Sequence, residues 1–175
     1  MPQAALLQRV PHAPDDVLAM VADVERYPDF ISLISAARIT KRLAAGEGLQ
    51  KFEADAVVAY KFISETFGSL VSVDHKARTI SVTKSNRGGA VKSLRNDWVF
   101  HPLSDGSTLV DFDVDVRLKA FPLEMLAREK FDKAAAKIMG YFIDHARETL
   151  PIVGQDGLNM PAEVRQLGLP LTRLI

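Results

Sequence analysis

A continuous helical pattern over residues 122–150 constrains the fold more than any other stretch of the sequence. Pro122 suits a first helical turn, where its missing N–H needs no intrahelical partner, and Pro151 cannot continue a helix. At 1.5 Å per residue the helix would be roughly 40 Å long, so its apolar stripe needs a large partner surface. The stripe recurs at steps of three and four residues and consists of Leu123, Ala127, Phe131, Ala134, Ala135, Ile138, Phe142 and Ala146.

Composition places the chain among ordinary globular proteins. It has 175 residues, of which 47% are hydrophobic and 25% charged, which suits one domain with a real core. Basic and acidic residues number 22 each, so net charge gives no argument for nucleic acid and we expect no DNA partner. The chain has no cysteine, which excludes disulfides, thiolate metal sites and cysteine nucleophiles. No run approaches the ~20 apolar residues of a membrane span, and MPQAALLQRV lacks the features of a secretory signal, so we expect a cytoplasmic protein.

Two-residue alternation predicts that most of the remaining chain is β-strand. A first strand at 3–10 precedes a short helix that begins at Pro14 and ends near Tyr27-Pro28, because the residue before proline disfavours the α region. The later strands are joined by short turns, which favours an antiparallel meander with one apolar face. The long helix is the only element large enough to cover that face, so we predict an α+β fold. The later strands are expected near residues 36–43, 50–60, 62–73, 79–84, 92–103 and 108–118.

The apolar face of this sheet combines aromatic with small residues, and that mixture has two interpretations. One is a packed core. The other is a ligand cavity, which requires the helix to stand off the sheet, and the helix offers small residues at Ala134, Ala135, Gly140 and Ala146. Gly140 is unusual, since glycine costs roughly 1 kcal/mol against alanine in a helix interior. A close contact, a kink or room for a ligand could each explain it.

The sequence contains no recognisable catalytic or metal-binding pattern. Its four histidines are not spaced as metal ligands. The alternation Asp111-x-Asp113-x-Asp115 lacks the glycine of a calcium loop and reads as the wet face of a strand. We therefore predict no catalytic residue, no metal ligand and no enzymatic activity. A basic cluster at Lys84, Arg87, Lys92 and Arg95 is either a solvated rim or a contact for anionic lipid headgroups or RNA.

Four stretches of the sequence are distinctive: VADVERYPDFI (21–31), FISETFGSLVSVDHKARTI (62–80), GGAVKSLRNDWVFHPL (88–103) and FDKAAAKIMGYFIDHA (131–146). They resemble the coenzyme Q-binding family and its relatives, the ribosome-association toxins, within the START-like (SRPBCC, polyketide cyclase/dehydrase) superfamily. Asp-x-x-x-Tyr-Pro-x-Phe and Leu-x-x-x-Trp-x-Phe are the most specific elements. There are departures: the chain has Gly89-Ala90-Val91 where the family usually has Gly-Pro-Phe, and His145 where it usually has arginine.

The resemblance implies a helix-grip fold, in which a curved antiparallel sheet of about seven strands wraps around the C-terminal helix. It implies a START-like domain at 1–150, to which 151–175 is an extension. The last nine residues, 167–175, are mostly apolar, so they could pack on the domain, on a second copy or on a bilayer. The cavity between sheet and helix would bind ubiquinone or another lipid as a carrier or chaperone for respiration, with no other cofactor. The alternatives are a ribosome-binding inhibitor of translation and a polyketide cyclase-like enzyme, and peripheral contact with the inner membrane stays open. The implied ligand-binding residues are Tyr27, Pro28, Phe30, Phe52, Ala54, Phe67, Leu94, Asn96, Trp98, Phe112, Phe131, Ala135, Ile138 and Phe142.

Overall fold

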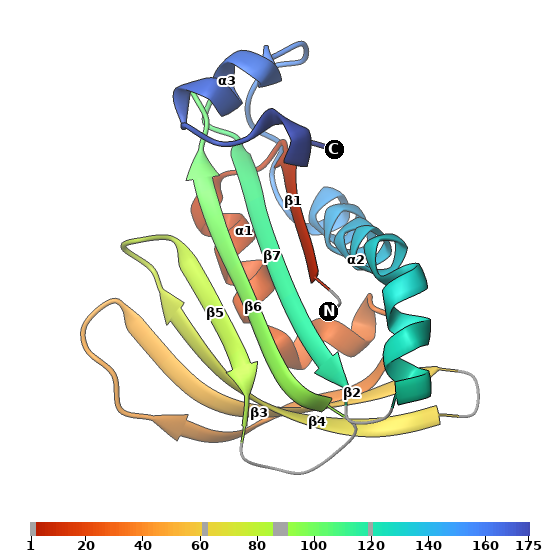
Figure 1. Ribbon diagram of the computed structural model, residues 1–175. Helices are drawn as coiled ribbons and strands as arrows, with labels where there is room; N and C mark the ends of the chain where they lie inside the picture. Colours follow the sequence, from red (N-terminus) through yellow and green to blue (C-terminus); the bar gives the residue numbers. More distant parts are fainter. Residues whose placement is uncertain (1–2, 61–62, 86–90, 119–120) are drawn as a thin grey trace.

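The computed structural model describes residues 3–60, 63–85, 91–118 and 121–175, with the side chains of 3–59, 64–85, 91–117 and 131–175. The elements follow the predicted order of strand, short helix, six strands and long helix (Figure 1). They are β1 (Gln3–Val10), α1 (Pro14–Ala22), η1 (Val24–Asp29), β2 (Ile34–Leu43), β3 (Leu49–Tyr60), β4 (Ile63–Asp74), β5 (Thr79–Lys84), β6 (Val91–Pro102), β7 (Thr108–Leu118), α2 (Phe121–Thr149), α3 (Met160–Gln166) and η2 (Leu171–Arg173).

The described strands form one seven-stranded antiparallel sheet in the order β1-β7-β6-β5-β4-β3-β2. The predicted α+β class and the helix-grip arrangement are confirmed. Trp98 of β6 lies opposite Ile80 of β5 and Phe112 of β7. All three are buried in one core cluster, because residues directly opposite in antiparallel strands share a face. The prediction therefore assigned these side chains to the correct face of the sheet.

Helices α1 and α2 both pack on the inner face of the curved sheet. Val17 and Val21 of α1 and Ala135 and Phe142 of α2 belong to the same core cluster. Ala134 was expected in the stripe but is exposed. The buried line runs through its neighbour Ala135 and through Met139, which the prediction omitted. A Cβ at Gly140 would meet nothing within 4 Å, so a close contact does not explain this glycine. Leu123 and Ala127 lie outside the described side chains.

The C-terminal extension packs on the outer face of the sheet, at the end of β1, β6 and β7 that points up in Figure 1. Leu6 and Leu7 of β1 are both buried, Leu6 in the main core and Leu7 in a second cluster. A strand buries adjacent residues only when both of its faces are covered. The extension therefore packs on its own domain, one of the three arrangements that the sequence left open. The second cluster comprises Leu7, Leu103, Leu109 and Val164, with Leu158, Met160, Leu169, Leu171 and Leu174 beside it.

Polar contacts also join the extension to the sheet. Asp105, in the β6–β7 turn, accepts hydrogen bonds from Arg9 Nη2 and from the backbone N–H of Gln155, both at 2.9 Å. Desolvation would raise the pKa of Asp105, but the hydrogen bonds from Ser107, Gln155 and Arg9 outweigh it and hold that pKa well below its usual range. At the chain end, the Ile175 N–H donates to the carbonyl of Leu7 at 2.9 Å. That bond shields part of the β1 edge, which would otherwise be open to pairing with another chain.

Candidate ligand-binding site

A cavity of about 290 Å³ lies between the inner face of the sheet, α2 and the segment that contains η1. Its size is near the lower end of the ~300–1,000 Å³ of small-molecule pockets. The wall is almost wholly aliphatic and aromatic, because every strand from β2 to β7 contributes its inward-facing side chains. The lining residues are Val21, Val24, Tyr27, Ile31, Leu33, Ile34, Ala37, Ala54, Asp55, Ala56, Val58, Ser69, Val71, Ile80, Val82, Leu94, Asn96, Trp98, Phe112, Val114, Ile138 and Phe142.

Aromatic rings close the inner end of this cavity. The ring of Phe142, from α2, lies 5.2 Å from that of Trp98 and 5.3 Å from that of Tyr27, both edge-on. The Trp98 and Phe112 rings meet edge-on at 4.7 Å. Edge-to-face contacts of this kind are favourable beyond the area that they bury. They fix the helix, the sheet and η1 relative to one another around the cavity.

The polar side chains in the wall already have partners within the protein. The Oδ1 atom of Asn96 accepts from Trp98 Nε1 at 2.7 Å, and Asn96 Nδ2 donates to the Asp113 carbonyl at 3.1 Å. The Tyr27 hydroxyl donates to the Val21 carbonyl, and burial, followed by the nearby charge of Asp23, raises the pKa of Tyr27 above its usual range. Asn96 thus orients Trp98 and is engaged at both ends of its amide.

Accessibility of the wall increases along each strand, away from the aromatic end. In β6, Trp98 is buried, whereas Asn96 and Leu94 are half-buried. The same change occurs from Phe112 to Val114 in β7. In Figure 1 this direction runs toward the lower ends of β6 and β7. The cavity therefore has a closed aromatic end and a more accessible aliphatic end.

Two side-chain contacts join the segment after η1 to α2. The ring of Phe30 stacks on that of His145 at 4.0 Å and 5°, and Ser32 Oγ lies 2.7 Å from the Tyr141 hydroxyl. His145 stands where the resembling family usually has arginine. An imidazole can stack flat on a phenyl ring as a planar guanidinium does, so the exchange retains a planar partner for Phe30.

Eight of the fourteen residues expected to contact a ligand lie in the cavity wall. Their role in binding stays a prediction. The wall also contains aliphatic residues that the prediction omitted, among them Leu33, Val71 and Ile80. Alternation with Trp98 and Ala54 on neighbouring strands was the signal that could have found Val71 and Ile80. The eight are Tyr27, Ala54, Leu94, Asn96, Trp98, Phe112, Ile138 and Phe142.

The other six lie elsewhere. Pro28 is inside η1, and Phe30 packs against Tyr27, Phe142 and His145, behind the wall. Phe67 is half-buried opposite Ala56 but does not reach the cavity. Ala135 belongs to the packed core, and the half-buried Phe131 packs against it. Phe52 is buried beneath a second, more polar cleft of about 310 Å³ between α1 and the β2–β3 edge, which Glu25, Arg42, Gln50 and His75 also line.

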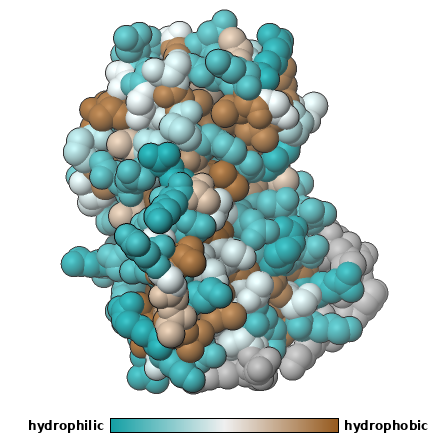
Figure 2. Space-filling view, turned by 90° about the vertical axis from the view of Figure 1, so that its left-hand side faces the viewer, coloured by the Kyte–Doolittle hydropathy of each residue, from teal (hydrophilic) through white to brown (hydrophobic). Residues whose placement is uncertain are grey.

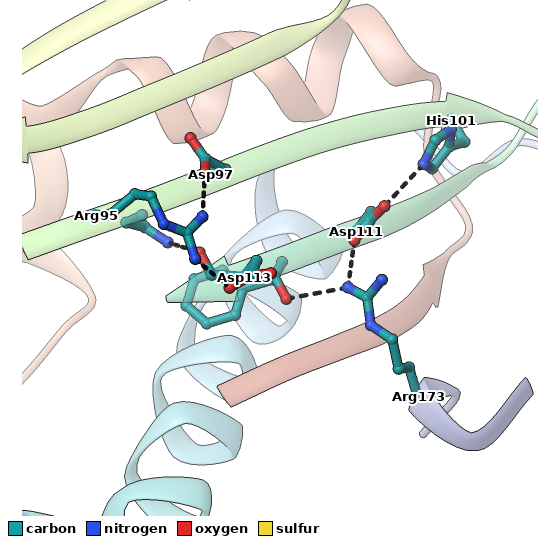
Figure 3. Close-up of polar contacts among 8 residues, drawn as sticks. Arg95, Asp97, His101, Asp111, Asp113 and Arg173 are labelled. Carbon is teal, nitrogen blue, oxygen red and sulfur yellow. Dashed lines mark hydrogen bonds and ion pairs between the residues drawn. The ribbon is translucent and has the colours of Figure 1, made fainter. Parts of the chain in front are cut away.

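The outer face of the sheet carries the predicted acidic residues, and two of them, Asp111 and Asp113, pair with basic side chains (Figure 3). Asp111 contacts His101 at 3.1 Å and also Arg173, while Asp113 accepts from Arg95 at 3.1 Å. Desolvation would raise the pKa of Asp111, but the hydrogen bonds from His101 and Arg173 outweigh it and keep that pKa below its usual value. Among the described residues no group of three acidic or histidine side chains is arranged to hold a metal ion. Arg95, part of the predicted basic cluster, is thus paired with acids, and Arg87 lies outside the described residues.

On the face shown in Figure 2, apolar side chains form separate groups among hydrophilic ones. Within the described part of the chain, no helix combines the length and apolarity that crossing a bilayer requires.

Comparison with known proteins places this geometry in a family. The family model described as polyketide cyclase/dehydrase and lipid transport matches residues 10–141. Among curated proteins, the persistence and stress-resistance toxin PasT and the ribosome association toxin RatA, both of Escherichia coli, are 27% and 26% identical over 148 residues. Each match covers 85% of this chain and 89% of the toxin. The mitochondrial coenzyme Q-binding protein of Schizosaccharomyces pombe is 24% identical over 138 residues, covering 79% of this chain and 82% of that protein.

Solved structures show the same fold. A START superfamily protein from Mycobacterium smegmatis superposes with a TM-score of 0.71 at 17% identity, covering 83% of this chain and 97% of that one. An 18 kDa protein from Caulobacter crescentus superposes with a TM-score of 0.70 at 29% identity, covering 85% and 97%.

Proposed function

This chain belongs to the polyketide cyclase/dehydrase and lipid transport family, and we propose that it binds a prenyl quinone, ubiquinone in the first instance, as a carrier or chaperone that supports respiration. The observation that carries the proposal is the cavity of about 290 Å³ with its aliphatic and aromatic wall. An apolar cavity favours apolar ligands, because each buried CH₂ contributes about 0.8 kcal/mol. The similarity to a coenzyme Q-binding protein supports the choice of a quinone.

Binding is favoured over catalysis by the state of the polar groups in the wall. General acid–base chemistry needs an ionisable group within hydrogen-bond reach of the reacting atom. The phenol of Tyr27 is committed to the Val21 carbonyl. Asp55 lies between the inward-facing Ala54 and Ala56, so strand alternation directs its side chain to the outer face. The family description includes cyclases, and a cyclase would require at least two ionisable groups that face the cavity.

Organic extraction of the purified protein, followed by mass spectrometry, tests the proposal. We expect a co-purified quinone or other lipid, and saturable binding when ubiquinone is added to delipidated protein. Trp98 is the one tryptophan of the chain and lines the cavity, so its emission should change on binding. A protein that is isolated empty and gives no saturable signal with ubiquinone, fatty acids or phospholipids would exclude a carrier function.

A second candidate follows from the toxins among the relatives, one of which is named for ribosome association. Such a function depends on a surface contact and not on a ligand in the cavity. Co-sedimentation with purified ribosomal subunits distinguishes the two. Binding that persists in a variant with a filled cavity, such as Ala54→Leu, would favour the ribosomal function.

A further inference from the structure

The polar atoms of the cavity wall determine which part of an amphiphilic ligand can enter. A quinone ring, carboxylate or phosphate needs donors or acceptors to replace the water that it loses on burial. In the described wall, the acceptor oxygen of Asn96 is occupied by Trp98 Nε1 at 2.7 Å. The Tyr27 hydroxyl is occupied by the Val21 carbonyl, and Ser69 Oγ donates to the Ala54 carbonyl at 3.4 Å.

The side chains at the inner end of the wall offer only carbon to a ligand. Trp98 and Phe142 close the inner end, and Val71 and Ile80 form its floor, all four buried. A hydrocarbon chain loses nothing by entering such an environment, whereas a headgroup would leave its oxygens without partners. A ligand that carries both groups is therefore expected to enter with its chain first.

The size of the cavity leads to the same orientation. A volume of about 290 Å³ accommodates part of a lipid and not a headgroup together with a long chain. The half-buried aliphatic residues Ile34, Val58 and Leu94 lie at the accessible end. A headgroup at that end keeps its contact with water.

We propose that the cavity binds the hydrocarbon chain of its ligand and leaves the polar headgroup at the accessible end beside Ile34, Val58 and Leu94, so that the protein selects a prenyl or acyl chain and not a quinone ring. This inference rests on the proposed function, because it assumes that a lipid occupies the cavity. It adds that affinity depends on the chain and little on the headgroup.

Calorimetric titration with three compounds tests this orientation. Ubiquinone-2 carries a ring and a short prenyl chain, geraniol carries the same chain without the ring, and ubiquinone-0 carries the ring without a chain. We expect ubiquinone-2 and geraniol to bind with dissociation constants within about fivefold of each other, and ubiquinone-0 to show no saturable binding. Binding of ubiquinone-0 together with failure of geraniol would overturn the orientation while leaving quinone binding intact. If none of the three binds, and fatty acids also fail, the proposed function itself is wrong.

The second N–H of Asn96 is the donor most able to reach a buried headgroup, so Asn96→Leu provides a sharper test. If the chain lies inside, the ratio of the ubiquinone-2 and geraniol dissociation constants should stay within about threefold of the wild-type ratio. A selective loss of ubiquinone-2 affinity by tenfold or more, with geraniol unaffected, would place the ring beside Asn96 and refute the proposal.

Because Asn96→Leu also removes the partner of Trp98, Ala54→Leu serves as a second variant at the inner part of the wall. It should weaken both ligands by the same factor, since it shortens the space for the chain. Unequal weakening would contradict a shared position of the two chains.

Discussion

The same substitution at two buried alanines should have opposite effects on stability if the cavity is real. Ala54 of β3 and Ala135 of α2 are equally inaccessible, at 5% and 4% exposure. Both belong to the main core cluster, but only Ala54 also lines the cavity. An alanine-to-leucine change adds three carbon atoms at each position. Only at Ala54 is there empty space to receive them.

The expected magnitudes follow from burial and packing. At Ala54, three additional carbons would contribute about 2.4 kcal/mol at about 0.8 kcal/mol per buried CH₂. Restriction of the leucine rotamers would offset roughly 0.5–1 kcal/mol of that gain. We therefore expect Ala54→Leu to stabilise the unliganded protein by about 1.5 kcal/mol, or about 3–6 °C in Tm for a chain of this size. At Ala135, overpacking typically destabilises by about 1–3 kcal/mol.

Urea unfolding monitored by the emission of Trp98 and by circular dichroism measures both effects. The midpoint should rise for Ala54→Leu and fall for Ala135→Leu, with the slope against urea unchanged in each case. Ala54→Leu should also reduce the affinity for any ligand that wild type binds. If both variants are destabilised to the same extent, Ala54 is in a packed core, and the cavity on which the proposed function depends does not exist.

Three further predictions concern the conformation and polar contacts of single residues. Asp105→Asn should destabilise the protein at neutral pH. The pKa of Asp105 in the folded state lies below its ordinary value of 3.8, so the stabilisation that its carboxylate provides is complete above that pH and is lost as the pH falls. The stabilities of variant and wild type should therefore converge in acid unfolding curves. Gly154→Ala should cost more than Gly157→Ala in thermal melts: both glycines have positive φ, but only at Gly154 would the Cβ lie 2.5 Å from Asp105 Oδ2, and equal losses would count against that contact. Tyr27→Phe should cost about 1–3 kcal/mol by leaving a buried carbonyl unpaired. Since the folded pKa of Tyr27 is raised above 10.0, the stability that it provides is present below that pH and lost above it, so the variant should lack the wild-type decline in alkaline unfolding curves.

The positions of the strands and the residues that face the core were predictable where polar residues alternate with apolar ones. Thr79–Lys84 and Thr108–Leu118 have the predicted bounds, and β6 is shifted by one residue. In these strands the alternation of charged with apolar residues indicates which face of the strand packs in the core. The turn at residues 104–107 likewise follows from its Ser-Asp-Gly-Ser sequence.

Features that depend on contacts between distant segments could not be predicted from local pattern. Leu6-Leu7 breaks the alternation of β1, and the reason becomes visible only when residues 158–174 cover the outer face. Whether α2 closes a core or a cavity depends on the gap between helix and sheet. The sequence alone does not reveal which of the two alanines, Ala54 or Ala135, lies beside that gap. Phe67 shows the limit of alternation, since it shares a face with Ala56 but does not line the cavity.

Helix α2 both packs in the core and forms part of the cavity wall, and it does so with adjacent faces. Ala135, Met139 and Ala146 are buried in the core and do not line the cavity, whereas Ile138 and Phe142 line it. Because residues three and four apart lie side by side on a helix, the helix could not move away from the sheet to admit a ligand without also separating its core contacts. A fixed wall of this kind favours entry of a chain along the cavity from its accessible end. Substitutions on α2 should divide accordingly: changes at Ala135 or Met139 should alter stability, and changes at Ile138 should alter affinity first.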